Sequence, residues 1–458
     1  MSTRPTPALF ADRVLTEGGW AQDVRIEIGG DGHITSLTQE TSARPGDDRF
    51  AILIPGMLNA HSHAFQRAFA GLAEQRGTGG DDFWSWRERM YTAALRMTPE
   101  RMAAIALHLY IDLLKGGYTS ICEFHYLHHG DDAAPPLAMA TSLIDAAAES
   151  GIGLTLVPTL YQRSGFSGGP LHPAQQRFAL TTEAFTELLE QLAPFIAGHL
   201  AMNMGFGLHS LRAVDAATAR ELAAYPPLSA PASIHIHAAE QVKEVEECRA
   251  ALGAPPIAWL CDNVGLNERW MVVHAIHMAE NESVDLARSG ATVAICPTAE
   301  ANLGDGIFPL ASYLREKGRI AIGSDAHMSV SPIDELRLLE TGQRLSKRSR
   351  LIASTDQEPN TGAFLWRACA ESGSRTGAKI GKLAVGARAD ILALDPGDPM
   401  IAGREQDFIL DSLVFAADRN AITDVFVAGR HAVKAGHHPH AERARTAFIS
   451  AVQGLFAD

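Results

Sequence analysis

Short apolar segments alternate with helical stretches through most of this chain, and this alternation constrains the fold more than any other feature. Eight segments with strand character begin near residues 52, 119, 154, 203, 233, 270, 292 and 320. Strands that alternate with helices form parallel β/α units, and eight such units predict an α/β fold with a closed (β/α)8 TIM-like barrel. An open doubly wound sheet is the alternative. The sequence disfavours it, because no G-x-G-x-x-G fingerprint follows an early strand.

Both ends of the chain have a different pattern, of short strands joined by turns. The first fifty residues alternate with period two around a Gly/Asp turn at residues 29–32, which predicts a hairpin. Because neither end has enough strands to be stable alone, we expect the two ends to form one small composite β-sandwich domain. The predicted division is residues 1–54 and residues 386–458 with a terminal helix for this domain, and residues 55–385 for the barrel.

Charge and cysteine content narrow the possible partners and location. The formal net charge of -14 argues against a nucleic acid or an anionic membrane as a partner. The first residues lack the pattern of a signal peptide, and no apolar stretch is long enough to span a bilayer. The five cysteines form no C-x-x-C pair, which is typical of a reduced protein. We therefore expect a cytoplasmic location.

Groups that can bind a metal or transfer a proton follow four of the predicted strands. His61 and His63 come after the first strand. Because residues two apart share one face of a strand, both imidazoles can reach one metal ion. In a barrel the carboxyl ends of the strands carry the chemistry. The other groups at such ends are His237 and Glu240 after the fifth strand, His274 after the sixth and Asp325 after the eighth.

Each of these groups also has an ordinary structural interpretation. A histidine at a strand end is often only hydrogen-bonded, an aspartate there often caps a helix, and a lone H-x-H is more often a polar turn. Together the groups are more specific, because three imidazoles and a carboxylate suit Zn²⁺ with a water as a further ligand. Fe²⁺ and Mn²⁺ accept the same mixed set, so the identity of the metal stays open.

In the order of these residues the chain resembles the amidohydrolase superfamily, and the resemblance extends to the closing motif at residues 386–390. His237 and Glu240 match the H-x-x-E of its deaminase branch. Two-metal members use a lysine after strand four, and no lysine lies between Lys115 and Lys243, so one divalent metal ion is expected. The implied metal ligands are His61, His63, His237 and Asp325. The implied catalytic groups are Glu240, His274 and Asp325.

Four further segments resemble the N-formimino-L-glutamate deiminases within that superfamily, and they comprise residues 63–72, 83–91, 123–126 and 208–212. These enzymes of L-histidine degradation hydrolyse a formimino group to formyl and release ammonia. Their substrate is a small dicarboxylate, and arginine binds carboxylates in a bidentate manner. Only seven of the 39 cationic residues here are lysine. The resemblance implies a homodimer and substrate contacts from Gln66, Arg87, Tyr126, His209 and Arg212.

Other interpretations of these residues and of the function remain open. Arg87 lies between two tryptophans and could be a stacked surface cation, Tyr126 could serve packing, and Gln66 could cap a helix. The nearest alternative function is a metal-dependent deaminase of a nucleobase or related heterocycle. An amide hydrolase of the imidazolonepropionase type would release no ammonia. A non-enzymatic barrel that serves assembly would typically lack part of the metal set, which is complete here.

Overall fold

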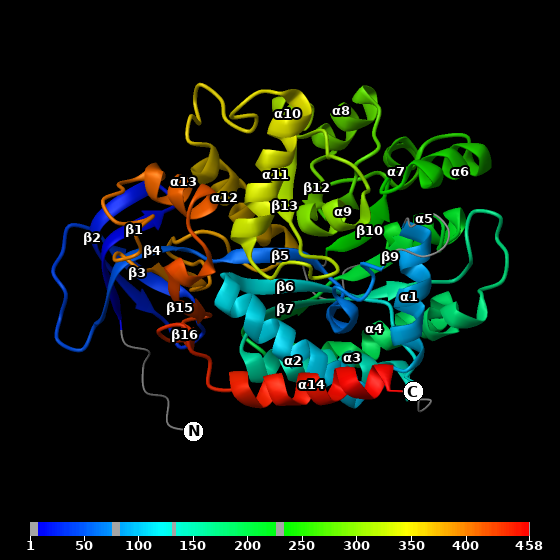
Figure 1. The fold of residues 1–458 in the computed structure, drawn as a ribbon, viewed down its shortest axis with the longest axis horizontal. Coiled ribbons are helices and arrows are strands. Elements are labelled where there is room, and N and C mark those ends of the chain that lie inside the picture. Colours follow the sequence, from blue (N-terminus) through cyan, green and yellow to red (C-terminus); the bar gives the residue numbers. More distant parts are fainter. Residues whose placement is uncertain (1–7, 76–82, 131–133, 226–232, 458) are drawn as a thin grey trace.

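The computed structural model describes residues 8–75, 83–130, 134–225 and 233–457. Within these residues a ring of parallel strands forms the centre of the molecule (Figure 1). This arrangement confirms the predicted barrel. The strands follow one another in chain order: β5 (Met57–Ser62), β6 (Tyr118–His125), β7 (Gly153–Leu160), β9 (Phe206–Ser210), β10 (Ile234–Ala238), β11 (Trp270–His274), β12 (Thr292–Ile295) and β13 (Arg319–Ile322). The short β8 (Met202–Met204) pairs with β7 beside this path.

The barrel closes between its last and first strands at the end where the functional residues lie. A parallel bridge joins Ser62 to Asp325. The amide of Asp325 donates to the carbonyl of His61 at 3.0 Å, and the amide of His63 donates to the carbonyl of Asp325 at 3.2 Å. Gly323 permits this approach, because a Cβ at that position would lie 2.8 Å from Cβ of His61. Closure of the barrel therefore brings residues from the two ends of the sheet together.

Helices cover the outside of the barrel, and α2 illustrates how the sequence sets their limits. The hydroxyl of Thr98 accepts from the amide of Arg101, and Gly117 ends the helix in the left-handed conformation at φ 108°. The barrel helices are α1 (Phe83–Leu95), α2 (Pro99–Gly116), α3 (Pro136–Ser150), α4 (Thr182–Ile196), α5 (Ala216–Ala223), α6 (Val242–Leu252), α7 (Pro256–Val264), α8 (Glu280–Ser289), α9 (Pro297–Leu303), α10 (Leu310–Arg315), α11 (Pro332–Lys347) and α12 (Thr361–Glu371).

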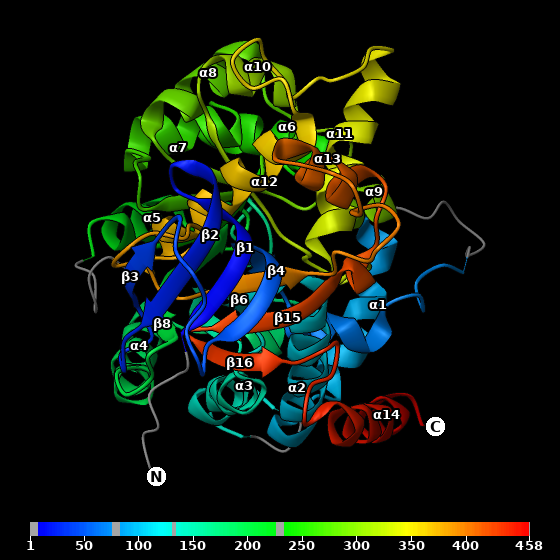
Figure 2. The same cartoon turned by 90° about the vertical axis from the view of Figure 1, so that its left-hand side faces the viewer.

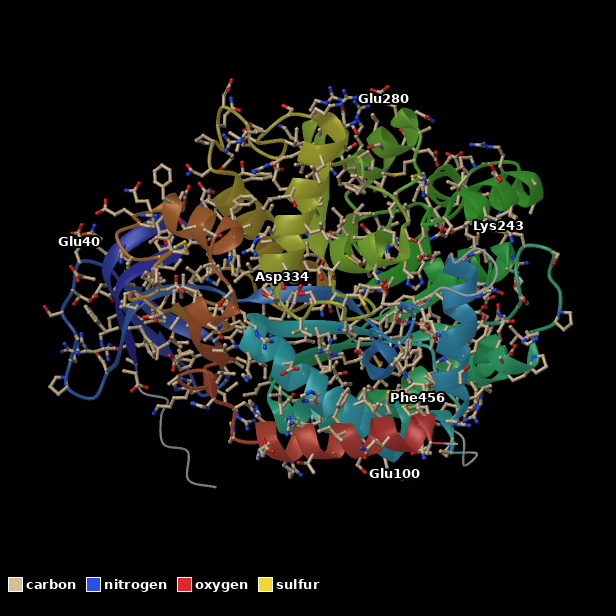
Figure 3. All side chains as sticks on the ribbon, viewed as in Figure 1. Glu40, Glu100, Lys243, Glu280, Asp334 and Phe456 are labelled. Atoms are coloured by element: carbon tan, nitrogen blue, oxygen red, sulfur yellow. The ribbon has the colours of Figure 1, made fainter. Side chains whose placement is uncertain are left out.

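Two later helices complete the outer layer. The terminal helix α14 (Ala441–Phe456) packs along α2, as both ribbon views show (Figures 1 and 2), and α13 (Asp407–Phe415) packs on α12. Charged side chains such as Glu40, Glu100 and Glu280 lie at the outer surface (Figure 3). Among the described helices, none combines the length and the apolar character that crossing a membrane requires.

A second sheet contains strands from both ends of the chain, as predicted. Figure 2 shows it face on, with its N-terminal strands in blue beside C-terminal strands in orange and red. Among the described residues its strands form one continuous sheet with a small apolar core of its own, which includes Leu9, Ile26 and Phe426. Its order is β16 (Arg430–Val433), β15 (Ile422–Val427), β14 (Ile391–Leu394), β4 (Asp48–Pro55), β1 (Leu9–Thr16), β2 (Gly19–Ile28) and β3 (Ile34–Thr38).

The position predicted for the first barrel strand was wrong. The apolar run from residue 51 onward belongs to β4, which pairs with β1 and β14 in the small sheet, and the first barrel strand begins only at Met57. Both segments are buried and apolar, so hydrophobicity does not distinguish the sheets to which they belong. The strands predicted near residues 119, 154, 233, 270, 292 and 320 begin within one residue of those positions. The domain limits at residues 54 and 386 stay a prediction.

The motif at residues 386–390 joins the small sheet to the barrel through a buried ion pair. Arg388 donates to the carboxylate of Asp390 from Nε at 2.9 Å and from Nη2 at 2.6 Å. Nη2 also donates to the hydroxyl of Ser120 on β6, and the amide of Ala428 donates to the same carboxylate at 3.0 Å. The side chains of Arg388 and Asp390 are 5% and 0% exposed. The pair therefore connects three separate parts of the chain.

We expect Asp390→Asn to lower the free energy of unfolding by about 3–5 kcal/mol, because the substitution leaves the guanidinium of Arg388 buried without its anion. Thermal or denaturant unfolding measures this change. The control is Glu316→Gln, which removes the partner of Arg288 in a pair whose arginine side chain is 68% exposed. This control should change the free energy of unfolding by less than about 1 kcal/mol. Equal effects of the two substitutions would contradict the role of the buried pair.

Candidate active site

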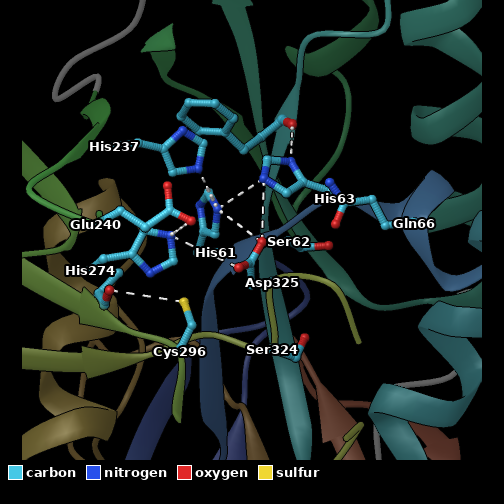
Figure 4. Close-up of polar contacts among 12 residues, drawn as sticks. His61, Ser62, His63, Gln66, His237, Glu240, His274, Cys296, Ser324 and Asp325 are labelled. Atoms are coloured by element: carbon cyan, nitrogen blue, oxygen red, sulfur yellow. Dashed lines mark hydrogen bonds and ion pairs between the residues drawn. The ribbon is translucent and has the colours of Figure 1, made fainter. Parts of the chain in front are cut away.

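Three imidazoles and one carboxylate meet at the carboxyl ends of the barrel strands (Figure 4). Nε2 of His61 lies 3.1 Å from Nε2 of His63 and 3.0 Å from Nε2 of His237. Oδ1 of Asp325 lies 3.4 Å from Nε2 of His63 and 3.6 Å from Nε2 of His61. All four residues are buried. The structure thus brings together the four residues that were predicted as metal ligands.

The histidine tautomers show that this group of residues fits a cation. Nδ1 of His63 donates to the carbonyl of Phe124 at 3.0 Å, and Nδ1 of His237 donates to the carbonyl of His209 at 2.9 Å. Burial lowers the pKa of His63 to about 3 and the pKa of His237 well below its ordinary value, so both rings are neutral. A neutral ring that donates from Nδ1 presents a lone pair at Nε2. These lone pairs and the nearby carboxylate form a histidine-rich potential metal site.

Ser62, between the first two ligands, points away from them and anchors the segment. Its hydroxyl donates to Oε2 of Glu123 at 2.7 Å and lies 3.0 Å from Nε2 of His327. Oε1 of Glu123 accepts from the amide of Ala64 at 2.7 Å. Burial raises the pKa of Glu123 to about 7, although these hydrogen bonds oppose the shift. Alternation along β5 therefore directs two imidazoles into the barrel mouth and one hydroxyl into the supporting network.

The predicted acid and base groups lie beside the potential metal site. Nε2 of His274 is 3.9 Å from Oε1 of Glu240 and 3.9 Å from Oδ2 of Asp325. Burial alone lowers the pKa of His274, but the carboxylates of Glu240, Glu300 and Asp325 together raise it to about 10. Burial raises the pKa of Asp325 to about 7, while His274 acts in the opposite direction. Groups with such shifted pKa values around one point suit proton transfer.

Backbone strain accompanies these strand ends. His274 has a φ of 70° and Asp325 a φ of 47°, and Ala239, between His237 and Glu240, has a φ of 55°. Residues other than glycine seldom adopt this left-handed conformation, which costs about 1–3 kcal/mol each. The surrounding structure therefore holds the backbone in an unfavourable conformation where the functional side chains leave the strands.

A cavity of about 200 Å³ opens above the potential metal site. The amide nitrogen of Gln66 donates to the hydroxyl of Tyr126 at 3.1 Å, and Nη2 of Arg212 lies 3.6 Å from Oε2 of Glu240. Burial alone lowers the pKa of Arg212, but Glu244 and Glu240 raise it, so the guanidinium remains charged. All five residues predicted to contact the substrate line this cavity: Gln66, Arg87, Tyr126, His209 and Arg212.

The cavity also contains residues that the sequence did not reveal. The amide nitrogen of Gln175 donates to the hydroxyls of Tyr91 at 3.1 Å and Tyr161 at 3.0 Å, and Lys243 and Glu247 lie at the same cavity. Most of them lie within helices or a loop, where no spacing distinguishes them from surface residues. Tyr161 directly follows β7, so attention to the end of the third barrel strand would have identified it.

Two other histidines have structural positions. Nε2 of His128 contacts the carbonyl of Thr159 at 2.8 Å, and Nε2 of His129 contacts the carbonyl of Ala179 at 2.9 Å. Neither residue lines the cavity formed by the described residues. Histidine content alone would therefore overstate the size of the site.

Comparisons with known proteins extend over nearly the whole chain. Residues 52–432 match the model described as "Amidohydrolase family", and residues 6–51 match "Formimidoylglutamate deiminase HutF, N-terminal domain". The chain is 45% identical over 454 residues to formimidoylglutamate deiminase of Pseudomonas aeruginosa, which covers 98% of this chain and 99% of that protein. A crystal structure of an amidohydrolase from Brucella melitensis superposes with a TM-score of 0.92 at 40% identity, covering 98% of this chain and 100% of that one.

More distant similarities concern the fold alone. An adenosine deaminase from Xanthomonas campestris, solved with bound zinc, superposes with a TM-score of 0.79 at 20% identity and covers 98% of this chain and 99% of that one. A 5-methylthioadenosine/S-adenosylhomocysteine deaminase of Haloarcula marismortui is 24% identical over 359 residues, which are 77% of this chain and 76% of that protein.

Proposed function

The chain belongs to the amidohydrolase family, and we propose that it hydrolyses N-formimino-L-glutamate to N-formyl-L-glutamate and ammonia in L-histidine degradation. The observation that carries this function is the 45% identity to a formimidoylglutamate deiminase across 98% of the chain. The protein is accordingly a hydrolase that acts on a C–N bond. The contents of the cavity agree with the chemistry of this substrate.

The substrate has a formimino group, cationic at neutral pH, on its α nitrogen, one carboxylate on the α carbon and a second carboxylate at the far end of the side chain. Arg87 and Arg212 line the cavity and are our candidates for the carboxylate contacts. Gln66, Tyr126 and His209 add polar groups to the same walls. Glu240 and Asp325 supply carboxylates near the potential metal site, where the cationic group would react. The charge distribution of the cavity therefore complements the substrate from one end to the other.

One divalent ion, with zinc as our first choice, completes this proposal. We assign His61, His63, His237 and Asp325 as its ligands, because their lone pairs converge as described above. A divalent ion at this site supplies Lewis acidity and lowers the pKa of a water toward neutrality. Iron(II) and manganese(II) are compatible with the same ligand set.

The proposed proton transfers use three side chains. Asp325 accepts a proton from the attacking water, and Nε2 of His274 hydrogen-bonds to the incoming oxygen and offsets its developing charge. The oxygen forms a bond with the formimino carbon. Glu240 then takes the hydroxyl proton of the tetrahedral intermediate and delivers it to the terminal nitrogen. The bond from that nitrogen to carbon breaks, the C=O bond of the formyl group forms, and ammonia leaves. The products are the N-formyl compound and ammonia, so one water is consumed in each turnover.

Ammonia release from a panel of substrates tests this function. We expect N-formimino-L-glutamate to be deaminated with a much higher kcat/KM than guanine, cytosine or adenosine. Chelation should abolish the activity, and added zinc should restore it. A higher kcat/KM with one of the heterocycles would contradict the proposed substrate. Full activity in chelated, metal-free protein would contradict the proposed metal.

We also propose that the enzyme acts in the cytoplasm as a homodimer. All five cysteines, which lie among the described residues, are free, and this suits a reducing compartment. The homodimer rests on resemblance to the family. Light scattering should therefore give a molar mass about twice the 49.1 kDa of one chain.

A further inference from the structure

Glu300, a buried carboxylate, contacts His274 but has no part in the steps above. It lies in α9 and is 4% exposed. Its Oε1 lies 3.2 Å from Nδ1 of His274 and accepts from the amide of Cys296 at 2.9 Å. His274 ends β11, whereas Cys296 follows β12. One carboxylate oxygen therefore connects the ends of two neighbouring barrel strands.

We propose that Glu300 is a positioning residue that holds the ring of His274 in its working orientation. The inference rests on the function proposed above. A carboxylate oxygen only accepts hydrogen bonds, so Nδ1 of His274 must carry the hydrogen. The opposite nitrogen, Nε2, is then fixed toward Oε1 of Glu240 and Oδ2 of Asp325, each 3.9 Å away. Without Glu300 the ring could rotate, and the geometry at Nε2 would be lost.

The carboxylate of Glu300 is itself held rigidly. The amide of Cys296 lies at the N-terminal end of α9, and the proline that follows at residue 297 begins the helix. Glu300 lies one helical turn further along, so its hydrogen bond to Cys296 spans the first turn. This short, helix-anchored connection lets the position of Oε1 determine the position of the imidazole.

Glu335 provides a matched control because it caps the same helix without the same contact. Its carboxylate accepts from the amide of Thr298 at 2.9 Å and from the hydroxyl of Thr298. It is buried, like Glu300. Loss of Glu335 should therefore weaken α9 to a similar degree, but it should leave the hydrogen bond at Nδ1 of His274 intact. Comparing the variants of Glu300 and Glu335 therefore distinguishes support of α9 from positioning of His274.

We expect Glu300→Ala to lower kcat by about 10- to 100-fold, the range for partners that orient active-site histidines, with little change in KM or bound metal. Glu300→Gln keeps an acceptor oxygen and should recover a large part of this loss. Glu335→Ala should lower the unfolding temperature and leave kcat within about threefold of wild type. These values are measured with the substrate of the panel that the wild-type enzyme deaminates best, so failure of the proposed substrate does not affect the comparison.

A proton spectrum gives a readout independent of turnover. A hydrogen-bonded Nδ1–H of a buried histidine resonates at low field, and His274→Asn identifies the signal of His274 by its loss. We expect this signal to be absent or displaced in Glu300→Ala and unchanged in Glu335→Ala. The proposal is overturned if the signal is the same in Glu300→Ala, or if Glu335→Ala lowers kcat as much as Glu300→Ala. If Glu300→Ala does not fold, Glu300→Gln and Glu300→Leu replace it. The proposal is then overturned if both variants keep the His274 signal in place and retain wild-type kcat.

Discussion

Glu240→Gln is expected to lower kcat for N-formimino-L-glutamate by about 10²–10⁴-fold, the usual contribution of a general acid or base. Oε1 of Glu240 lies 3.9 Å from Nε2 of His274, and Oε2 lies 3.6 Å from Nη2 of Arg212. Glutamine fills the same space but does not carry a proton to the departing nitrogen. Metal content should stay the same, because Glu240 is not among the four proposed ligands. Ammonia release and metal analysis of the same preparation measure both quantities.

The control for Glu240 is Glu247→Gln, which removes an acid from the same cavity. Glu247 pairs with Lys243 at 3.9 Å, and its side chain is 42% exposed. We expect this variant to retain kcat within a few fold. Wild-type turnover by Glu240→Gln would exclude the proposed proton transfer. Loss of metal from that variant would instead indicate that Glu240 is a ligand.

Arg212→Met is expected to reduce kcat/KM for N-formimino-L-glutamate by about 30-fold to several thousandfold. This range corresponds to the roughly 2–5 kcal/mol lost when one partner of a buried charge pair is truncated. The side chain of Arg212 is 10% exposed, so water compensates little for the lost guanidinium. Most of the change should lie in KM, because a carboxylate contact acts in the bound substrate as well as in the transition state.

The closeness of Arg212 to Glu240 requires a test that separates substrate binding from an effect on catalysis. The N-formimino derivatives of 4-aminobutyrate and L-2-aminobutyrate each lack one of the two carboxylates. If Arg212 binds one carboxylate, Arg212→Met should have little effect on the derivative that lacks it and a large effect on the other. Equal losses with both derivatives would show that Arg212 acts through Glu240. Lys243→Met removes a 59% exposed cation from the same cavity. It controls for the electrostatic effect of losing one positive charge near the substrate.

Much of the site could be predicted from the sequence because parallel strands place their carboxyl ends together. His237, His274 and Asp325 lie at the ends of recognisable apolar barrel strands, and His61 and His63 follow an apolar run that belongs to the small sheet. The structure brings all five to one end of the barrel. The resemblance to a family added the arginines and polar groups of the cavity wall, whose spacing alone carries no such information. Their roles as ligands, acids and substrate contacts stay predictions that the variants above test.

Other features could not be predicted from the sequence, for identifiable physical reasons. The run before Gly56 and the strand after it are equally apolar, so only hydrogen bonding separates the small sheet from the barrel. Gln175 and Tyr91 come from segments without strand character, and a hydrogen bond joins them at the cavity. Glu300 follows the seventh barrel strand by five residues, at a helical position that more often faces solvent or caps a helix.

The sequence by itself determined the barrel, the strand ends that carry the functional groups and the composite sheet, because periodic burial and local turns specify elements in order along the chain. Tertiary structure alone decided how those groups meet. Closure of the barrel at the bridge between Ser62 and Asp325 joins segments more than 260 residues apart, with the amide of Asp325 on the carbonyl of His61 at 3.0 Å. Distances, tautomers and supporting hydrogen bonds arise only from that closure, because each depends on groups from distant parts of the chain.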